Sequence, residues 1–177
     1  MPGPGERAAQ GERIIIFEHD PRWRLLFAEE AERIRRACGA AIVAIEHVGS
    51  TSVPGLAAKP IIDIMTGVSD LAAAHALIPA MERLGYESAG AHGVEGRLYF
   101  RRGAPRSHHV HMTEMGSAFW RKHLLFRDRL RADPEMAAEY AAMKRALAAQ
   151  FGTDRDGYTD AKTGFIERCL VAAGWRD

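Results

Sequence analysis

The stretch of residues 42–68 constrains the fold more than any other part of the chain. A run rich in β-branched residues, 42–48, ends at the small residues Gly-Ser-Thr-Ser of 49–52, and a second apolar run occupies 60–65. β-Branched residues favour strands, so the stretch predicts two buried strands joined by a turn and a connection punctuated by Pro and Gly. The second run contains one acid, Asp63. Burying an ionised carboxylate is costly, so Asp63 is expected to face a cleft or to hold a positive partner.

The remaining sequence predicts helices at both ends and short strands between them. Asp20-Pro21 and Gly39 bound a helix whose charged face, which includes Glu30, is predicted to be solvated. Further helices are predicted at 71–84 and beyond Gly116, where Ser117 and Asp133-Pro134 are expected to begin two of three C-terminal helices. Extended segments are predicted at 14–17, 86–88, 97–102 and 107–112. We therefore predict one α+β domain over residues 12–177, with a mixed sheet, flanking helices and a three-helix C-terminal part.

Composition narrows the classes of partner. The chain has 177 residues, 47% of them hydrophobic and 27% charged, and a formal net charge of +1. This near-neutral balance gives no general attraction to nucleic acid or to a membrane surface. No apolar stretch approaches the roughly 18 residues of a membrane span. Residues 1–11 resemble a disordered tail and not a signal peptide, which predicts a cytoplasmic protein.

The small-residue turn and the acid together suggest a phosphate site. Gly49, Ser50 and Thr51 place backbone amides and hydroxyls where a strand ends, and such turns bind phosphate. Lys59 precedes the acid-bearing strand, and Asp63 alternates along it with apolar neighbours. A metal-bound nucleotide needs amide donors for its phosphates and carboxylates for its cation. The stretch supplies the donors and one carboxylate, although an ordinary structural turn has the same composition.

Histidines suggest a second chemistry. His47, His109 and His111 are expected on strands near Asp63. Two histidines at alternating strand positions plus a carboxylate are typical ligands of a zinc- or iron-type metal site. The alternative is structural, in which His109 or His111 hydrogen-bonds Asp63 and compensates its buried charge.

Basic residues that could contact an anion lie in three places: one face of the 97–102 strand, the helix after Ser117, and the last helix. Guanidinium groups suit phosphate and carboxylate because of their forked donors. For any one of these residues, a surface ion pair is the alternative. The candidates are Arg97, Arg101, Arg121, Lys122, Arg127 and Lys162.

Four segments of the chain resemble the GrpB family. They are Glu46–Ile64, Arg106–His111, Trp120–Arg131 and Tyr158–Lys162, and the similarity extends over nearly all of residues 14–171. The family is similar to the nucleotidyltransferase superfamily and also occurs fused to dephospho-CoA kinase. The resemblance implies a nucleotidyltransferase-like fold, in which a Gly-Ser turn holds phosphates and acids on adjacent strands hold a divalent metal.

This chain departs from the usual metal motif of that superfamily. The motif has two acids one residue apart on the second strand and a third acid on a later strand. Here the positions two away from Asp63 are Ile61 and Met65, and the later strand offers His109 and His111. Magnesium prefers carboxylate and phosphate oxygens to imidazole, so a two-metal mechanism lacks most of its ligands.

Three functions remain open from the sequence. The leading hypothesis is a nucleotidyltransferase-like protein that binds a phosphate-bearing small molecule, with Asp63 and Lys59 as candidate catalytic residues if it transfers a nucleotidyl group. The second is a non-catalytic nucleotide- or anion-binding module. The third is a single-metal hydrolase that uses His47, Asp63, His109 and His111. The expected cofactor is a divalent metal, Mg or Zn, and no nucleic-acid or membrane partner is expected.

Overall fold

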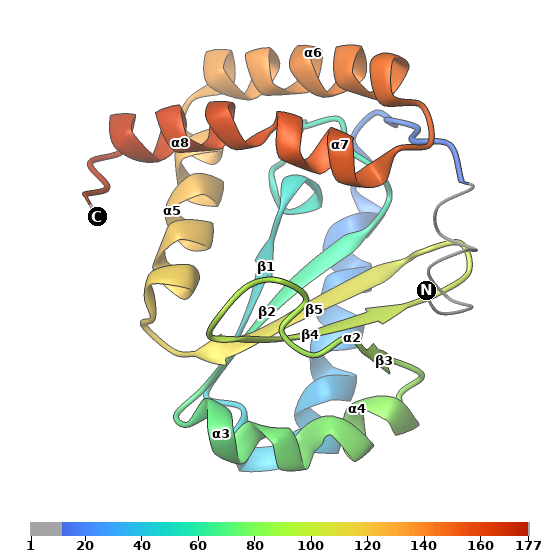
Figure 1. Ribbon diagram of the computed structural model, residues 1–177, viewed down its shortest axis with the longest axis vertical. Helices are drawn as coiled ribbons and strands as arrows, with labels where there is room; N and C mark the ends of the chain where they lie inside the picture. Colours follow the sequence, from blue (N-terminus) through green and yellow to red (C-terminus); the bar gives the residue numbers. More distant parts are fainter. Residues whose placement is uncertain (1–11, 177) are drawn as a thin grey trace.

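A five-stranded mixed sheet forms the centre of the molecule in the computed structural model, which describes residues 12–176 (Figure 1). The predicted tail, residues 1–11, lies outside the described residues. The spatial order of the strands is β1-β2-β5-β4-β3, with β2 and β5 parallel and the other neighbours antiparallel. Their bounds are β1 Ala44–Val48, β2 Ile62–Val68, β3 Glu87–Ser88, β4 Arg97–Arg102 and β5 His108–Glu114.

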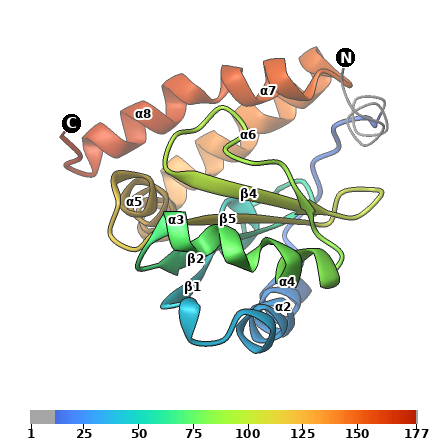
Figure 2. The same cartoon turned by 60° about the horizontal axis from the view of Figure 1, so that its bottom comes forward.

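Helices cover both faces of this sheet (Figure 2). One face carries α2 (Arg22–Cys38), α3 (Leu71–Ala74) and α4 (Ile78–Arg83), with the 3-10 helices η1 (Gly39–Ala41) and η3 (His75–Leu77) beside them. The other face is covered by α5 (Ala118–Ala132), α6 (Pro134–Phe151), α7 (Arg155–Ala161) and α8 (Thr163–Ala172). The predicted α+β class with a mixed sheet and flanking helices is confirmed.

The C-terminal part differs from the prediction in one respect. The last expected helix is two short helices, α7 and α8, which meet at Lys162. The weak helix formers Thr163 and Gly164 follow the break and favour it. The two preceding helix starts are as predicted, since Ser117 Oγ accepts from the Trp120 amide at 3.1 Å and Asp133 Oδ1 accepts from the Met136 amide at 3.0 Å.

Strand alternation divides the sheet into an apolar face and a polar face. Ile62, Ile64 and Val110 are at most 1% exposed and pack against α2 and α4 in the largest hydrophobic cluster. Each such side chain stabilises the fold by roughly 1.5–3 kcal/mol through burial. The opposite face of β2, β5 and β4 carries Asp63, His109, His111, Arg97 and Arg101. The sheet therefore uses one face for the core and presents the other to the C-terminal helices.

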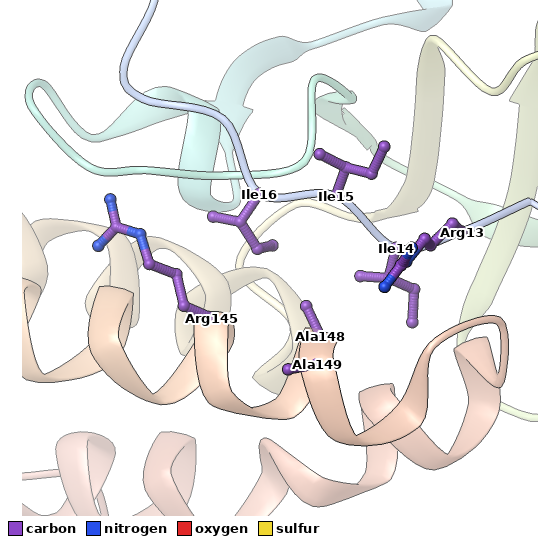
Figure 3. Close-up of a pocket in the computed structure, with 7 residues that line it drawn as sticks. All are labelled: Arg13, Ile14, Ile15, Ile16, Arg145, Ala148 and Ala149. Carbon is purple, nitrogen blue, oxygen red and sulfur yellow. The ribbon is translucent and has the colours of Figure 1, made fainter.

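Residues 14–17 form an extended cover and no strand of the sheet. Phe17 and Ala58 exchange two backbone hydrogen bonds of 2.9 Å, and the Ile14 amide donates to the Gly152 carbonyl. Figure 3 shows this segment beside α6, with a cavity of about 360 Å³ between them. None of the residues predicted for a functional site lines that cavity. No helix within residues 12–176 has the length and apolar character needed to cross a membrane.

Candidate anion-binding site

The turn after β1 lies directly against Asp63. Gly49 has a φ of +69°, and a Cβ atom there would lie 2.6 Å from Asp63 Oδ2. Glycine is required both for the backbone conformation and for this close approach. The following residues form the 3-10 helix η2, Ser50–Ser52. The predicted proximity of the turn and the acid is therefore present.

The two hydroxyls expected to bind phosphate have different environments. Ser50 Oγ accepts a 2.8 Å hydrogen bond from Lys144 Nζ, and the Ser50 hydroxyl also hydrogen-bonds the Tyr140 side chain. Thr51 is buried, and its hydroxyl lies 3.0 Å from His47 Nε2 and donates to the Ile61 carbonyl. Both side chains thus have partners within the protein, and only the Ser50 hydroxyl contacts a lysine.

Asp63 lies in a histidine-rich face of the sheet. In the parallel register of β2 and β5, Asp63 pairs with His109 and Met65 pairs with His111. His109 Nδ1 is 3.1 Å from Asp63 Oδ1, and His111 Nε2 is 3.7 Å from the same oxygen. Alternation places Asp63, His109 and His111 on one face, as the sequence predicted. These contacts match the structural alternative, in which an imidazole ring hydrogen-bonds the carboxylate and compensates its charge.

Arg97 sets the orientation of His111. Its Nη1 lies 3.3 Å from His111 Nδ1, and a guanidinium group only donates. His111 Nδ1 is therefore the acceptor, so the ring proton is on Nε2 and faces Asp63. Arg97 itself is 8% exposed, and its other donors bond to the carbonyls of Ala91 and His92. Arg97 therefore acts on Asp63 indirectly, by orienting His111.

The Asp63 carboxylate is ionised and partly open to solvent. Burial opposes its ionisation, but the contacts with His109 and His111 outweigh burial and hold the pKa of Asp63 below its ordinary value. Its side chain remains 27% exposed. The acid is therefore not sealed beneath the hydrophobic core, and a ligand approaching the turn could reach it.

The prediction that His47 belongs to this cluster is wrong. His47 pairs across the sheet with Ile64, so its side chain lies on the apolar face opposite Asp63. There it stacks on Phe27 of α2, with ring centroids 4.6 Å apart. Burial lowers the pKa of His47 to about 4, so the ring is neutral at pH 7. Successive side chains of a strand point to opposite faces, so an error of one residue in the expected register of β1 is enough to place His47 on the wrong face.

The donor set around Asp63 does not fit the metal centres expected from the sequence. Ile61 and Met65, the neighbours of Asp63 on its own side of the strand, are buried apolar residues. Within residues 12–176, no group of three or more His, Cys, Asp or Glu side chains is arranged to hold a metal ion. A two-magnesium site needs several carboxylates, and a zinc site needs three protein ligands that converge.

Two lysines flank the site on a shared aromatic ring. Lys59 Nζ lies 4.9 Å and Lys162 Nζ 4.6 Å from the centre of the Tyr158 ring. Burial, followed by repulsion from Lys162, lowers the pKa of Lys59 to about 8, while the charge of Asp63 opposes that shift. The pKa of Lys162 is also lowered by burial and is supported by Asp63. Both predicted lysines therefore lie in the electrostatic reach of the acid.

A third lysine was missed by the sequence analysis. Lys144 on α6 is 2% exposed, and its Nζ donates to Ser50 Oγ and, at 2.5 Å, to the Ala57 carbonyl. Burial, followed by repulsion from Lys162, lowers the pKa of Lys144 to about 7. In the sequence, Lys144 is one of several charged residues in a predicted helix. The only signal of its burial is its spacing of three residues from the apolar Ala141, which places both on one side of the helix. Lys59, Lys144 and Lys162 are called the lysine cluster below.

His123 was also outside the predicted site. Its ring lies 5.9 Å from that of His111 and 4.1 Å from that of Phe119, and its Nδ1 is 2.8 Å from the Phe119 carbonyl. Burial and the neighbouring His111 lower the pKa of His123 to about 4. It lines the α5 side of the histidine face as a neutral ring.

The other predicted basic residues have partners away from Asp63. Arg101 pairs with Glu87 at 2.8 Å, and Arg127 pairs with Glu46 at 2.7 Å. The side chains of Arg121 and Lys122 lie over the Trp175 ring, 5.3 and 5.1 Å from its centre. These cations of β4 and α5 therefore do not converge on Asp63.

The chain is similar to known proteins over most of its length. The family model described as "GrpB protein" matches residues 13–171. The chain is 42% identical over 156 residues to "UPF0157 protein YqkA" of Bacillus subtilis, covering 88% of this chain and 46% of that protein. It is 30% identical over 218 residues to a protein named "Dephospho-CoA kinase" of Mycolicibacterium paratuberculosis, covering 97% of this chain and 54% of that protein.

A solved structure shows the same fold. The crystal structure of conserved protein GrpB from Enterococcus faecalis has a TM-score of 0.83 and 38% sequence identity, covering 90% of this chain and 96% of that chain. The chain therefore spans nearly all of one relative and about half the length of others. Because the family model and the solved structure each cover nearly the whole described chain, the chain belongs to the GrpB family.

Proposed function

We propose that this protein binds a phosphate-bearing small molecule, such as a nucleotide, where the turn of Gly49 and Ser50 meets the lysine cluster. The observation that supports this proposal is the balance of charge. Burial lowers the pKa of all three lysines, repulsion from Lys162 lowers those of Lys59 and Lys144 further, and Asp63 is the carboxylate that favours the charged forms of Lys59 and Lys162. Buried like charges raise the free energy of the empty protein, and a bound anion relieves that cost.

The surrounding groups suit phosphate oxygens. Ser50, at the start of η2, contacts the Lys144 ammonium group through its hydroxyl, and the turn presents small residues beside Asp63. Nucleotidyl transfer at the same place would use Asp63 beside the phosphates and Lys59 near the developing negative charge. The single carboxylate favours binding over metal-dependent transfer, because the lysine charges oppose a cation there.

Anion titrations test the proposal. Sulfate, AMP, ADP and ATP would be titrated calorimetrically and by thermal shift, each with EDTA and with Mg²⁺. At a concentration of 100 times Kd, a ligand stabilises the fold by about 2.7 kcal/mol. We expect binding that persists in EDTA and that weakens about tenfold in Lys59→Met and in Lys162→Met, as expected when one charge-assisted contact is lost. Arg83→Met, an exposed position on α4, is the matched control.

The Asp63→Asn variant distinguishes two possible roles of Asp63, as a charge that opposes anion binding and as a metal ligand. If the lysine cluster binds the anion, removing the negative charge tightens sulfate binding severalfold, about the effect of one nearby charge at the protein surface. Loss of nucleotide binding in Asp63→Asn, together with a requirement for Mg²⁺, would instead assign the carboxylate to a metal. Phosphorus NMR of the same ATP samples reports whether any nucleotidyl or phosphoryl group is transferred. Equal affinities for wild type and both lysine variants would contradict the proposal.

A further inference from the structure

A second cavity lies at the free edge of β1. It has a volume of about 410 Å³ and is bounded by the N-terminal half of α2, by β1, by the turn of 51–54 and by the C-terminal half of α5. Within the described residues β1 pairs only with β2, so its other edge faces this cavity. We call it the edge pocket. Cavities of this size hold small organic molecules.

The edge pocket has an excess of positive charge. Arg24, Arg127 and Arg131 line it with one carboxylate, Glu46. Arg127 is compensated, since it contacts Glu46 at 2.7 Å and Asp128 at 2.8 Å. Arg131 donates from Nε and Nη2 to a neutral acceptor, the Ser52 carbonyl, at 3.1 and 2.8 Å, and its Nη1 lies 3.7 Å from Asp128, so part of its positive charge is not compensated. Arg24 is exposed, and no ion pair of it occurs among residues 12–176. The two outer guanidinium groups are therefore able to receive an anion.

The remaining wall is apolar and flat. Phe27 and His47 stack nearly parallel, with an angle of 6° between their rings, and Ile45 and Pro54 complete this side. His19 also lines the pocket, and its Nδ1 is buried without a hydrogen-bond partner. A combination of apolar and aromatic walls with a forked cation is typical of a site for a small aromatic acid.

We propose that the edge pocket is a second ligand site, specific for a small aromatic carboxylate. The carboxylate contacts Arg24 and Arg131, and the ring lies along the wall formed by Phe27, Ile45 and Pro54. Addition of a peptide strand to the β1 edge fits less well, because Arg127 Nη1 already bonds the His47 carbonyl at 3.0 Å. The site is distinct from the lysine cluster, because His47 and Ile45 lie on the face of the sheet opposite Asp63.

The fluorescent acid 1-naphthoate is a suitable probe for titration against the full chain. We expect it to bind wild type, and to bind Arg24→Gln and Arg131→Gln about tenfold more weakly, as expected for loss of one charge-assisted contact. Arg35→Gln removes the same charge from an exposed position farther along α2 and should bind like wild type. The neutral analogue 1-naphthalenemethanol should bind about tenfold more weakly than the acid. Melting curves of each variant establish that it is folded.

Two further measurements decide where the probe lies. Lys59→Met and Lys162→Met should each leave 1-naphthoate affinity unchanged. Weaker binding in either variant would place the probe in the lysine cluster and overturn the assignment. Absence of binding to wild type, or equal affinities of Arg24→Gln and Arg35→Gln, would also overturn it. These outcomes are independent of whether the lysine cluster binds nucleotides.

Discussion

Lys144 is the residue that joins the turn to the C-terminal helices. Its ammonium group is almost completely buried, yet its two hydrogen bonds go to uncharged oxygens of Ser50 and Ala57. A buried charge without an opposite charge costs several kcal/mol, which is consistent with the lowered pKa of about 7. An apolar side chain of similar length would avoid this cost but would leave the Ala57 carbonyl without its donor. Lys144 therefore has two candidate roles, in the fold and in the proposed binding of an anion.

Lys144→Met distinguishes these two roles. We expect the free energy of unfolding to stay within about 1 kcal/mol of wild type or to rise, since a buried charge is exchanged for an apolar group. Sulfate affinity should fall at least about tenfold, because both the charge and the orientation of the Ser50 hydroxyl are lost. Urea denaturation measures the first quantity and calorimetry the second. Lower stability with unchanged sulfate affinity would show that Lys144 has a structural role only.

The residue scale also shows what strand parity and helix pattern can predict. Asp63, His109 and His111 were expected together and lie together, because parity along β2 and β5 fixes their face. The position of His47 was predicted wrongly, because the register of β1 relative to β2 cannot be read from the sequence. Lys144 was missed because a helical cation is normally solvated, and only the packing of α6 over the turn buries it.

At the scale of elements, the turn between β1 and β2 has two glycines with left-handed backbones. Gly49 and Gly55 have φ values of +69° and +78°. A Cβ atom at Gly49 would overlap Asp63, whereas a Cβ at Gly55 would have no heavy atom within 4 Å. The two positions thus share a positive φ and differ in the contact with the acid.

Gly49→Ala and Gly55→Ala form a matched pair. Each should lose about 1–2 kcal/mol from left-handed strain. We expect Gly49→Ala to lose a further 1–3 kcal/mol or so, because the turn or the carboxylate must shift. Urea denaturation gives both values, and sulfate titration should show weaker binding for Gly49→Ala alone. Equal losses at the two positions would mean that the approach of the turn to Asp63 has little energetic weight.

Helices and strands were easier to predict than the tertiary contacts that their side chains make. Ser117 and Asp133 marked helix starts correctly, because a cap is a local hydrogen bond. The break at Lys162 was not predicted, and neither was the burial of Glu30, which was assigned to a solvated face. Glu30 is 3% exposed because Arg102 and Tyr86, distant in sequence, both bond to its carboxylate. Such partners are set by tertiary packing and have no signal in a local pattern.

For the whole molecule, the two faces of the sheet have different electrostatic character. The face toward α2 and α4 holds the apolar core, and the face toward the C-terminal helices holds the lysine cluster and the histidines. The depressed pKa values of about 7 for Lys144 and about 8 for Lys59 mean that the folded protein binds protons less tightly than the unfolded chain. Global stability should therefore depend on pH in a defined direction.

The sign follows from proton counting. Between about pH 7 and pH 10 the unfolded chain holds these protons and the folded chain releases them, so stability without ligand rises with pH by up to about 1.4 kcal/mol per unit for each lysine. Sulfate requires the charged lysines, so its stabilising effect should decline over the same range. Thermal denaturation from pH 6.5 to 9.5 with and without sulfate measures both trends. Stability that falls from pH 7 to pH 9 without ligand would contradict the assignment.

The parts of the anion site come from opposite ends of the chain. Gly49, Ser50 and Asp63 precede the midpoint, whereas Lys144 and Lys162 belong to the last quarter. On a ribosome, the acid and its turn emerge first, and the cations that complete the site follow many residues later. A nascent polypeptide therefore cannot assemble the proposed site until α6 and Lys162 have emerged. Capture of an anion there would report that the C-terminal helices have packed onto the sheet.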